Sequence, residues 1–343
     1  MKQFLDLVIA GPDMSGTSTQ IDDLINYFLS SGQRVRDLRG SEMATLFHSM
    51  KFQEYSKDHI SFGQRRADPN NSGKDIMPFL LDEQVSKDVK YDFLWKAQTY
   101  VERCRFASMQ QDFDKNPTYV ATSDIFELRK NDRFPYINPL SADVWVLEEP
   151  TFRGAGSENR FMEQNRSYFG LEIDPVAAAH DHQSYRISEF FRFRKHMREH
   201  GLIILRSRSE ESGCYQVYDP QYWTNGILTK DYLDLSGHKI AFANPPTHIF
   251  VVCATPNWSV RDYLALKTER SGGRPLDDHE KNAQYQVMVN KRYATNWLEE
   301  FYDKGCSLHG GTPPQIFRFD IYDSKKDVRE KMISTLKTLQ STQ

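Results

Sequence analysis

Hydrophobic and polar positions follow two different spacings near the amino terminus. An apolar run at 4–10 ends at Gly11, and a short continuous run of this kind is typical of a buried strand. At 18–29 the apolar residues recur at helical spacing, which predicts an amphipathic helix. Gly32 stands where such a helix would end, and 34–38 is a candidate second strand. The chain therefore opens with a strand, a loop, a helix and a strand.

The same alternation returns after residue 142. Candidate strands lie at 143–147, 202–205, 247–253 and 315–321. Candidate helices lie at 184–200, from 259 onward, at 277–301 and at 325–339. Strands that alternate with helices pair in parallel and are covered by those helices. We therefore predict an α/β fold, a three-layer sandwich with a mostly parallel sheet flanked by helices.

The stretch at 42–142 breaks this regularity. It is mainly polar, carries a turn cluster at 68–73, and contains a segment at 85–113 with a helical pattern. We predict a single domain over 1–343, in which 42–142 is an insertion.

Composition narrows the classes of protein to consider. The 343 residues carry a formal net charge of -3, which gives no overall attraction to nucleic acid or to an anionic membrane. The four cysteines are scattered without CxxC spacing, so we expect them to be reduced. No apolar run is long enough to span a bilayer, and the first run has no signal-peptide cleavage pattern. We expect a cytoplasmic protein with no membrane partner.

Basic and aromatic residues are mixed in the predicted helix at 184–200. Arg192, Arg194, Lys195 and Arg198 alternate with three phenylalanines. Such a mixture occurs in nucleic-acid contacts, but it is also typical of an amphipathic helix with one solvated face. We predict the amphipathic helix.

The loop between the first strand and helix has the composition of a phosphate-binding loop. It reads GPDMSGTST at 11–19, with two glycines and a hydroxyl residue at Walker A spacing. In such loops backbone N–H groups surround phosphate oxygens at a helix N-terminus. The candidate nucleotide-binding residues are Gly11, Asp13, Ser15, Gly16, Thr17, Ser18 and Thr19, with Ser18 also the candidate Mg²⁺ ligand. The alternative is a tight turn whose serine or threonine caps the helix.

One position departs from the motif. Thr17 stands where such loops carry a lysine, so the charge between the β- and γ-phosphates is missing. Another cation must replace it if the site transfers phosphate, and arginine can clamp phosphate through several donors. The candidates are Arg153, Arg206, Arg208, Arg270 and Arg274. We rank Arg208 first because it directly follows a predicted core strand.

These residues give the chain a resemblance to the thymidylate kinase family. The loop is similar to that family's GxDGxGKSTQ apart from Thr17, and Glu149 with Pro150 resembles its Glu-Pro motif. Arg186 precedes Gly201 at the spacing of the arginine that opens the family's phosphate-facing helix. The resemblance covers most of the chain outside the predicted insertion.

The resemblance implies catalytic roles for three residues. Glu149 would order the metal and the acceptor phosphate, and Arg186 would neutralise that phosphate. Arg208 matches the arginine of the family's Asp-Arg-Tyr motif, while Ser207 replaces its aspartate. Two positions that are charged in the family's site are therefore uncharged here, as Thr17 and Ser207.

The resemblance also implies nucleotide contacts. Asp13 would bind the deoxyribose hydroxyl, and Tyr215 with Gln216 matches a motif whose glutamine contacts the base. A lid near 268–282, which includes Arg274, would close over the donor phosphates. By the same resemblance the protein would be a homodimer.

Three functions remain open at this point. The first is Mg²⁺-dependent phosphoryl transfer from ATP to a pyrimidine deoxynucleoside monophosphate, dTMP or a modified relative. The second is a non-catalytic nucleotide-binding protein with a regulatory or scaffold role, which the two lost charges favour. The third keeps the transfer chemistry but places the acceptor nucleotide within DNA, with the insertion as extra surface.

Overall fold

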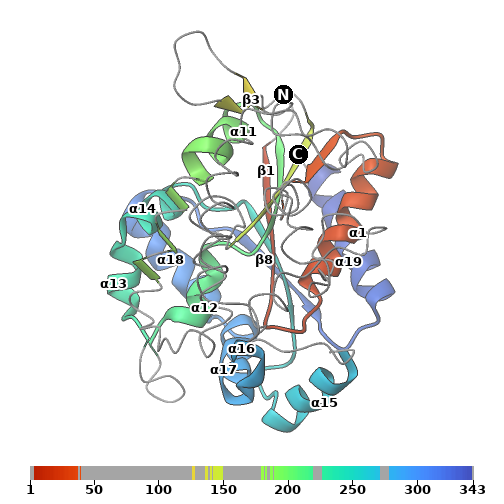
Figure 1. Ribbon diagram of the computed structural model, residues 1–343, viewed down its shortest axis with the longest axis vertical. Coiled ribbons are helices and arrows are strands. Elements are labelled where there is room, and N and C mark those ends of the chain that lie inside the picture. The colour runs from red at the N-terminus through yellow and green to blue at the C-terminus, as the bar shows by residue number, and fades with distance from the viewer. Residues whose placement is uncertain are drawn as a thin grey trace, which may run out of the picture.

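A parallel β-sheet forms the centre of the computed structural model (Figure 1). The structure describes residues 4–37, 39, 126–127, 136–137, 140, 142–149, 179–180, 182–183, 186–187, 189–218, 226–270 and 278–341. The six strands of the sheet follow the order β2-β5-β6-β1-β7-β8, and all neighbours are parallel. Their bounds are β1 Leu5–Ala10, β2 Val35–Asp37, β5 Val144–Glu148, β6 Ile203–Ser207, β7 His248–Cys253 and β8 Gln315–Asp320. The predicted strands are confirmed.

Helices cover both faces of this sheet (Figure 1). One face packs against α1 (Thr17–Ser30), α15 (Val260–Arg270) and α19 (Lys325–Ser341). The other packs against α13 (Thr229–Asp234), α14 (Ser236–Ala243), α17 (Ala283–Ala294) and α18 (Trp297–His309). The three-layer α/β fold predicted from the alternation of strands and helices is therefore confirmed.

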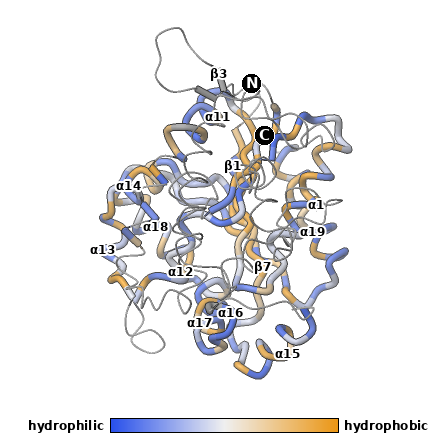
Figure 2. The backbone as a smooth tube through the Cα atoms, in the orientation of Figure 1, coloured by the Kyte–Doolittle hydropathy of each residue, from blue (hydrophilic) through white to orange (hydrophobic). Residues whose placement is uncertain are grey.

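The side-chain alternation of β1 explains why two cores form. Leu5, Leu7 and Ile9 belong to the core that includes α1 and α19. Val8 and Ala10 point the other way, into the core that includes α14 and α18. Figure 2 shows the hydrophobic strands at the centre and mixed hydropathy along the outer helices. A central strand of a parallel sheet is buried on both faces, and its sequence is accordingly almost continuously apolar.

Short elements complete the described fold. They are β3 (Phe126–Glu127), β4 (Tyr136–Ile137), the π-helix η2 (Phe190–Arg194), α11 (Lys195–Glu199), the 3-10 helix η3 (Glu210–Ser212), α12 (Gly213–Gln216) and α16 (Asp278–Lys281). Strands β3 and β4 form an antiparallel pair apart from the main sheet. No described helix is long and apolar enough to cross a membrane.

The single long helix predicted at 277–301 is wrong. Three helices occupy this region, separated at Asn282 and at Thr295. The Asn282 side chain accepts a hydrogen bond from the backbone N–H of Tyr285 and so caps the start of α17. Thr295 is extended, with φ -114°, which ends the same helix. Helical spacing of apolar residues continues across both breaks, so the pattern alone does not reveal them.

Several predictions concern residues outside the described ranges. They include the turn at 68–73, the helix at 85–113, Arg153 and Arg274. Because β2 pairs with β5, the predicted insertion at 42–142 lies in sequence between two adjacent strands. The domain boundaries and the lid remain predictions.

Candidate nucleotide-binding site

The loop at 11–16 joins the central strand β1 to the N-terminus of α1. Gly16 is the N-cap residue, with φ 79°, and no side chain caps α1. Gly11 has φ 156°, and a Cβ there would lie 2.3 Å from the carbonyl oxygen of Val252. The alternative of a serine or threonine capping turn is therefore not supported, because a glycine occupies the N-cap position and no side-chain cap hydrogen bond is made among the described residues.

Hydroxyl groups surround this uncapped helix end. Ser15 is 3% exposed, and its Oγ is buried without a hydrogen-bond partner among the residues that the structure describes. Thr17 is buried in the first helical turn, while Ser18 beside it is half-buried. An unpartnered buried hydroxyl next to free helix-end N–H groups is what an anion-binding loop presents before its ligand arrives.

Arg208 lies beside this loop and is bound to Asp13. Its Nη2 donates to Oδ1 of Asp13 at 2.7 Å, and both side chains are 19% exposed. The guanidinium carbon lies 4.6 Å from the centroid of the Tyr215 ring. The Tyr215 hydroxyl in turn donates to the carbonyl oxygen of Gly11 at 3.1 Å. The structure thus brings together four predicted site residues that are far apart in the sequence.

The backbone at Arg208 is unusual. Its φ of 66° lies in the left-handed region, which a long side chain rarely adopts. Its N–H donates to the carbonyl oxygen of Ile9 in β1 at 3.1 Å, which anchors the residue at the end of β6. Such conformations cost on the order of 1–3 kcal/mol and concentrate at functional sites. Met14 in the loop also has a left-handed backbone conformation, with φ 67°.

Gln286 holds the second oxygen of Asp13. Its Nε2 donates to Oδ2 of Asp13 at 2.6 Å, and its Oε1 accepts from the Asp13 backbone N–H at 3.1 Å. Gln286 itself is 0% exposed, on the face of α17 that meets the loop. Asp13 is therefore bound on both carboxylate oxygens and on its backbone. Its predicted role as the ligand of a sugar hydroxyl remains a prediction.

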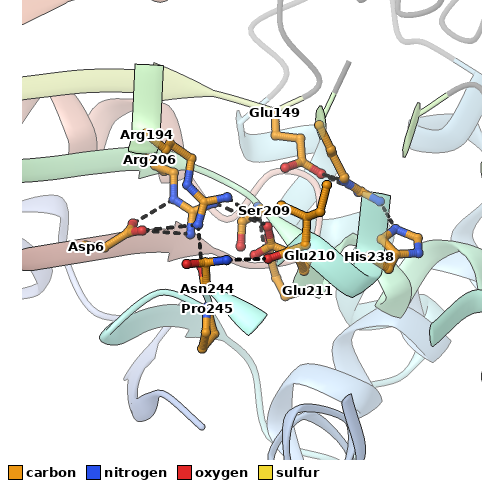
Figure 3. A network of polar contacts seen from close by, with 12 residues as sticks. Asp6, Glu149, Arg194, Arg206, Ser209, Glu210, Glu211, His238, Asn244 and Pro245 are labelled. Atoms are coloured by element: carbon orange, nitrogen blue, oxygen red, sulfur yellow. Dashed lines mark hydrogen bonds and ion pairs between the residues drawn. The ribbon is translucent and has the colours of Figure 1, made fainter. Parts of the chain in front are cut away.

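Two further predicted residues form a separate cluster. The Arg186 guanidinium is paired with Glu149 and also contacts the imidazole of His238. The His238 ring is stacked on Tyr232, with centroids 3.9 Å apart. Burial and the Arg186 charge lower the pKa of His238 well below its ordinary value, so the imidazole is neutral at pH 7. Figure 3 shows Glu149 and His238, and Arg186 hydrogen-bonds to both.

A buried carboxyl, Glu211, lies between the two clusters. It is 0% exposed, and the backbone N–H of Ser209 donates to its Oε2 at 2.5 Å. Within the described part of the chain, its Oε1 has no hydrogen-bond partner. Burial, together with the charge of Glu149, raises the pKa of Glu211 to about 7, although Arg208 acts in the opposite direction. The pKa of this carboxyl therefore falls in the neutral range.

An ion-pair network supports β1 and β6 behind the loop (Figure 3). Asp6 is 0% exposed, and its Oδ1 accepts from Nε of Arg206 at 2.7 Å. Arg194 lies 3.3 Å from Asp6 and 3.2 Å from Glu210. Arg206 is thus buried in this network and is not a candidate to replace the missing lysine.

The helix at 184–200 also differs from its prediction. Arg194 is 5% exposed and points into the network, and 190–194 forms a π-helix instead of an α-helix. The expected solvated basic face is therefore wrong at this residue. A carboxylate inside an apolar strand, Asp6 within LDLVIA, is the sequence signal that buried cations surround it.

The remaining candidate cation within the described residues is Arg270. Nη1 of Arg270 donates to the carbonyl oxygen of Met14 at 2.9 Å, and Nη2 donates to that of Ile321 at 2.6 Å. Arg270 therefore reaches the loop, but it binds backbone oxygens there. Among the described candidates, Arg208 is the arginine that combines contact with a loop side chain and partial exposure.

Mg²⁺ is the metal implied by the loop motif. The described residues contain no group of three or more histidine, cysteine or acidic side chains that could enclose a metal ion. Mg²⁺ usually keeps several water ligands and joins a protein oxygen to substrate phosphates. The half-buried Ser18 hydroxyl in the first turn of α1 suits that mode of binding.

Comparisons with known proteins give a limited result. No protein-family model matches the chain, and no curated protein matches it. Solved structures do match, among them the crystal structure of thymidylate kinase from Ehrlichia chaffeensis. That structure is 11% identical, with a TM-score of 0.42, and the alignment covers 98% of this chain and 99% of that chain. A likeness at this level identifies no activity.

Sequence reasoning missed Gln286 and Glu211. Gln286 lies on a helix far from the loop in sequence, and no local pattern marks it as a loop partner. Glu211 stands in a polar segment that resembles solvated loop sequence. For Gln216 the resemblance implies a base contact; its Oε1 is buried and has no hydrogen-bond partner among the described residues, and the base contact remains a prediction.

Proposed function

We propose that this protein binds a nucleotide at the loop 11–18 and transfers a phosphoryl group from ATP to a pyrimidine deoxynucleoside monophosphate, dTMP or a modified relative. The observation that carries the proposal is the uncapped N-terminus of α1 with the unpartnered Ser15 hydroxyl beside it. Backbone donors and a helix dipole in this arrangement favour phosphate.

Arg208 supplies the cation that Thr17 does not. It lies next to the loop, is partly exposed, and can bind phosphate oxygens through two donors once a ligand competes with Asp13. When bound, Mg²⁺ would neutralise the donor phosphates, with Ser18 as its protein ligand. Arg186 and Glu149 would orient the acceptor phosphate, as the resemblance to thymidylate kinases suggests.

The test is a radiolabelled phosphate-transfer assay with ATP, Mg²⁺ and a panel of nucleoside monophosphates. We expect transfer to dTMP or a modified relative, reduced about a hundredfold by Arg208→Ala, since an oriented charge contributes a few kcal/mol to transition-state stabilisation. Thr17→Lys in the Arg208→Ala chain should restore part of the rate. Arg34→Ala is the matched control, because Arg34 pairs with Asp143 on the exposed surface.

A second candidate is nucleotide binding without turnover, in a regulatory or scaffold role. The observation in its favour is that Asp13 already neutralises Arg208, and Thr17 leaves the loop without its own charge. If the chain binds ADP but transfers phosphate to none of the acceptors, this second function replaces the first. If it does not bind ADP or pyrophosphate, both are wrong.

A further inference from the structure

Helix α17 contacts three segments near the candidate site: the loop at Asp13, the segment 214–217 and the residues that follow β7. The Tyr285 hydroxyl donates to the carbonyl oxygen of Tyr215. Arg292 donates to the carbonyl oxygens of Cys214 and Val217, both at 2.9 Å. Asn290 accepts from the N–H of Ala254, just after β7. These side-chain bonds to backbone atoms hold α12, the residue after it and the segment that follows β7 against α17.

Gln286 is the α17 residue that reaches the nucleotide-binding loop. It bonds to Asp13 twice, once at the backbone and once at the carboxylate. The same carboxylate accepts from Arg208 through its other oxygen. A side-chain amide carries both an acceptor and a donor, and Gln286 uses both here: Oε1 accepts and Nε2 donates.

We propose that Gln286 is a positioning residue for phosphoryl transfer: it fixes the rotamer of Asp13 and thereby places the guanidinium of Arg208 at the loop. This inference rests on the proposed function. Without Gln286, the Asp13 carboxylate is free to rotate toward incoming phosphate, where its charge repels the ligand. Arg208 would follow it, because the two form an ion pair.

An exchange of groups tests the contact itself. Gln286→Glu keeps the acceptor for the Asp13 N–H but places two carboxylates in contact. In the double variant Asp13→Asn with Gln286→Glu, the asparagine Nδ2 donates to the glutamate, so the side-chain hydrogen bond returns with reversed polarity. The backbone N–H of residue 13 still donates to the glutamate, as it does to Gln286. The penalty of Gln286→Glu should therefore be much smaller in the Asp13→Asn background than in the natural one.

The measurement is kcat and KM for ATP. It compares the natural chain, Asp13→Asn, Gln286→Glu, the double variant and Gln286→Ala. We expect Gln286→Ala to lower kcat about tenfold with a smaller change in KM, because misplacement of a charged group mainly affects the transition state. We expect Gln286→Glu to cost at least about tenfold more in the natural chain than in the Asp13→Asn background. The control is Gln284→Glu, an exposed position of the same helix, which should leave the rate unchanged.

The outcomes separate this inference from the proposed function. Additive effects of Asp13→Asn and Gln286→Glu on kcat, in a chain that does transfer phosphate, overturn the positioning role. A loss of stability in Gln286→Ala with normal kcat has the same meaning, since a purely structural residue would behave in that way. If the natural chain binds ADP without turnover, the proposed reaction is wrong, and the positioning role in transfer is wrong with it.

Discussion

Arg208 donates to Asp13 at 2.7 Å, although the two residues stand 195 positions apart in the sequence. The pair joins the end of β6 to the loop that follows β1, two strands that are neighbours in the sheet. Because Arg208 is bound to a side chain of a loop that lacks its lysine, its carboxylate partner should control how much positive charge a phosphate ligand meets.

Removal of that carboxylate charge should strengthen phosphate binding. Asp13→Asn leaves the Arg208 guanidinium without its competing anion, so we expect pyrophosphate to bind about fivefold to tenfold more tightly, as the loss of a weak, partly exposed ion pair allows. Calorimetric titration with pyrophosphate isolates the phosphate contribution from any sugar contact. Unchanged or weaker binding would show that Arg208 does not meet the phosphates.

The buried carboxylate of β1 should be essential for stability. Asp6→Asn removes one of the two carboxylates that face Arg194 and Arg206, and it leaves Glu210 opposite two buried guanidinium charges. We expect the free energy of unfolding to fall by about 3–5 kcal/mol in urea denaturation. The control is Asp143→Asn, whose partner Arg34 is largely exposed, and its cost should stay below about 1 kcal/mol. Equal losses in the two variants would contradict this account.

Stability should depend on pH through Glu211. Its pKa is raised by burial from the ordinary 4.5 to about 7, so the folded state binds more protons than the unfolded state between these values. The stabilisation is complete below pH 4.5 and is lost as pH rises through 7. Glu211→Gln, which keeps an acceptor for the Ser209 N–H, should remove that slope and raise stability above pH 7 by about 3 kcal/mol. Urea midpoints measured from pH 5 to 8 check this, with the exposed Glu199→Gln as control.

The glycine that opens the loop should not tolerate a side chain. In Gly11→Ala the new Cβ would lie 2.3 Å from the Val252 carbonyl oxygen and 2.6 Å from Ser15 Oγ. We expect a loss of about 2–4 kcal/mol and no detectable pyrophosphate binding, because the loop must move away from β7. Gly310→Asn is the comparison: φ is 80° there and nothing lies within 4 Å, so about 1 kcal/mol is expected. Thermal unfolding of both variants checks the predicted losses of stability. Pyrophosphate titration of Gly11→Ala checks the predicted loss of binding.

The sequence by itself determined the strands of the main sheet, the helices α1, α15 and α19, and the position of the loop at 11–18. These features depend on residues close together in the chain: a strand is recognised by an apolar run, a helix by its spacing, and a phosphate-binding loop by glycines at fixed offsets. The helix breaks at Asn282 and Thr295 were not predicted, because the apolar spacing continues through them.

Only the tertiary structure decided which side chains meet at the site. The strand order places β6 beside β1, which brings Arg208 to Asp13, and it carries α17 back over the loop, so that Gln286 reaches a residue 273 positions away. The same packing turned Arg194 inward to Asp6. Local sequence encodes the type of each element, but the partners of a charged or amide side chain depend on which elements become neighbours, and no local pattern specifies that.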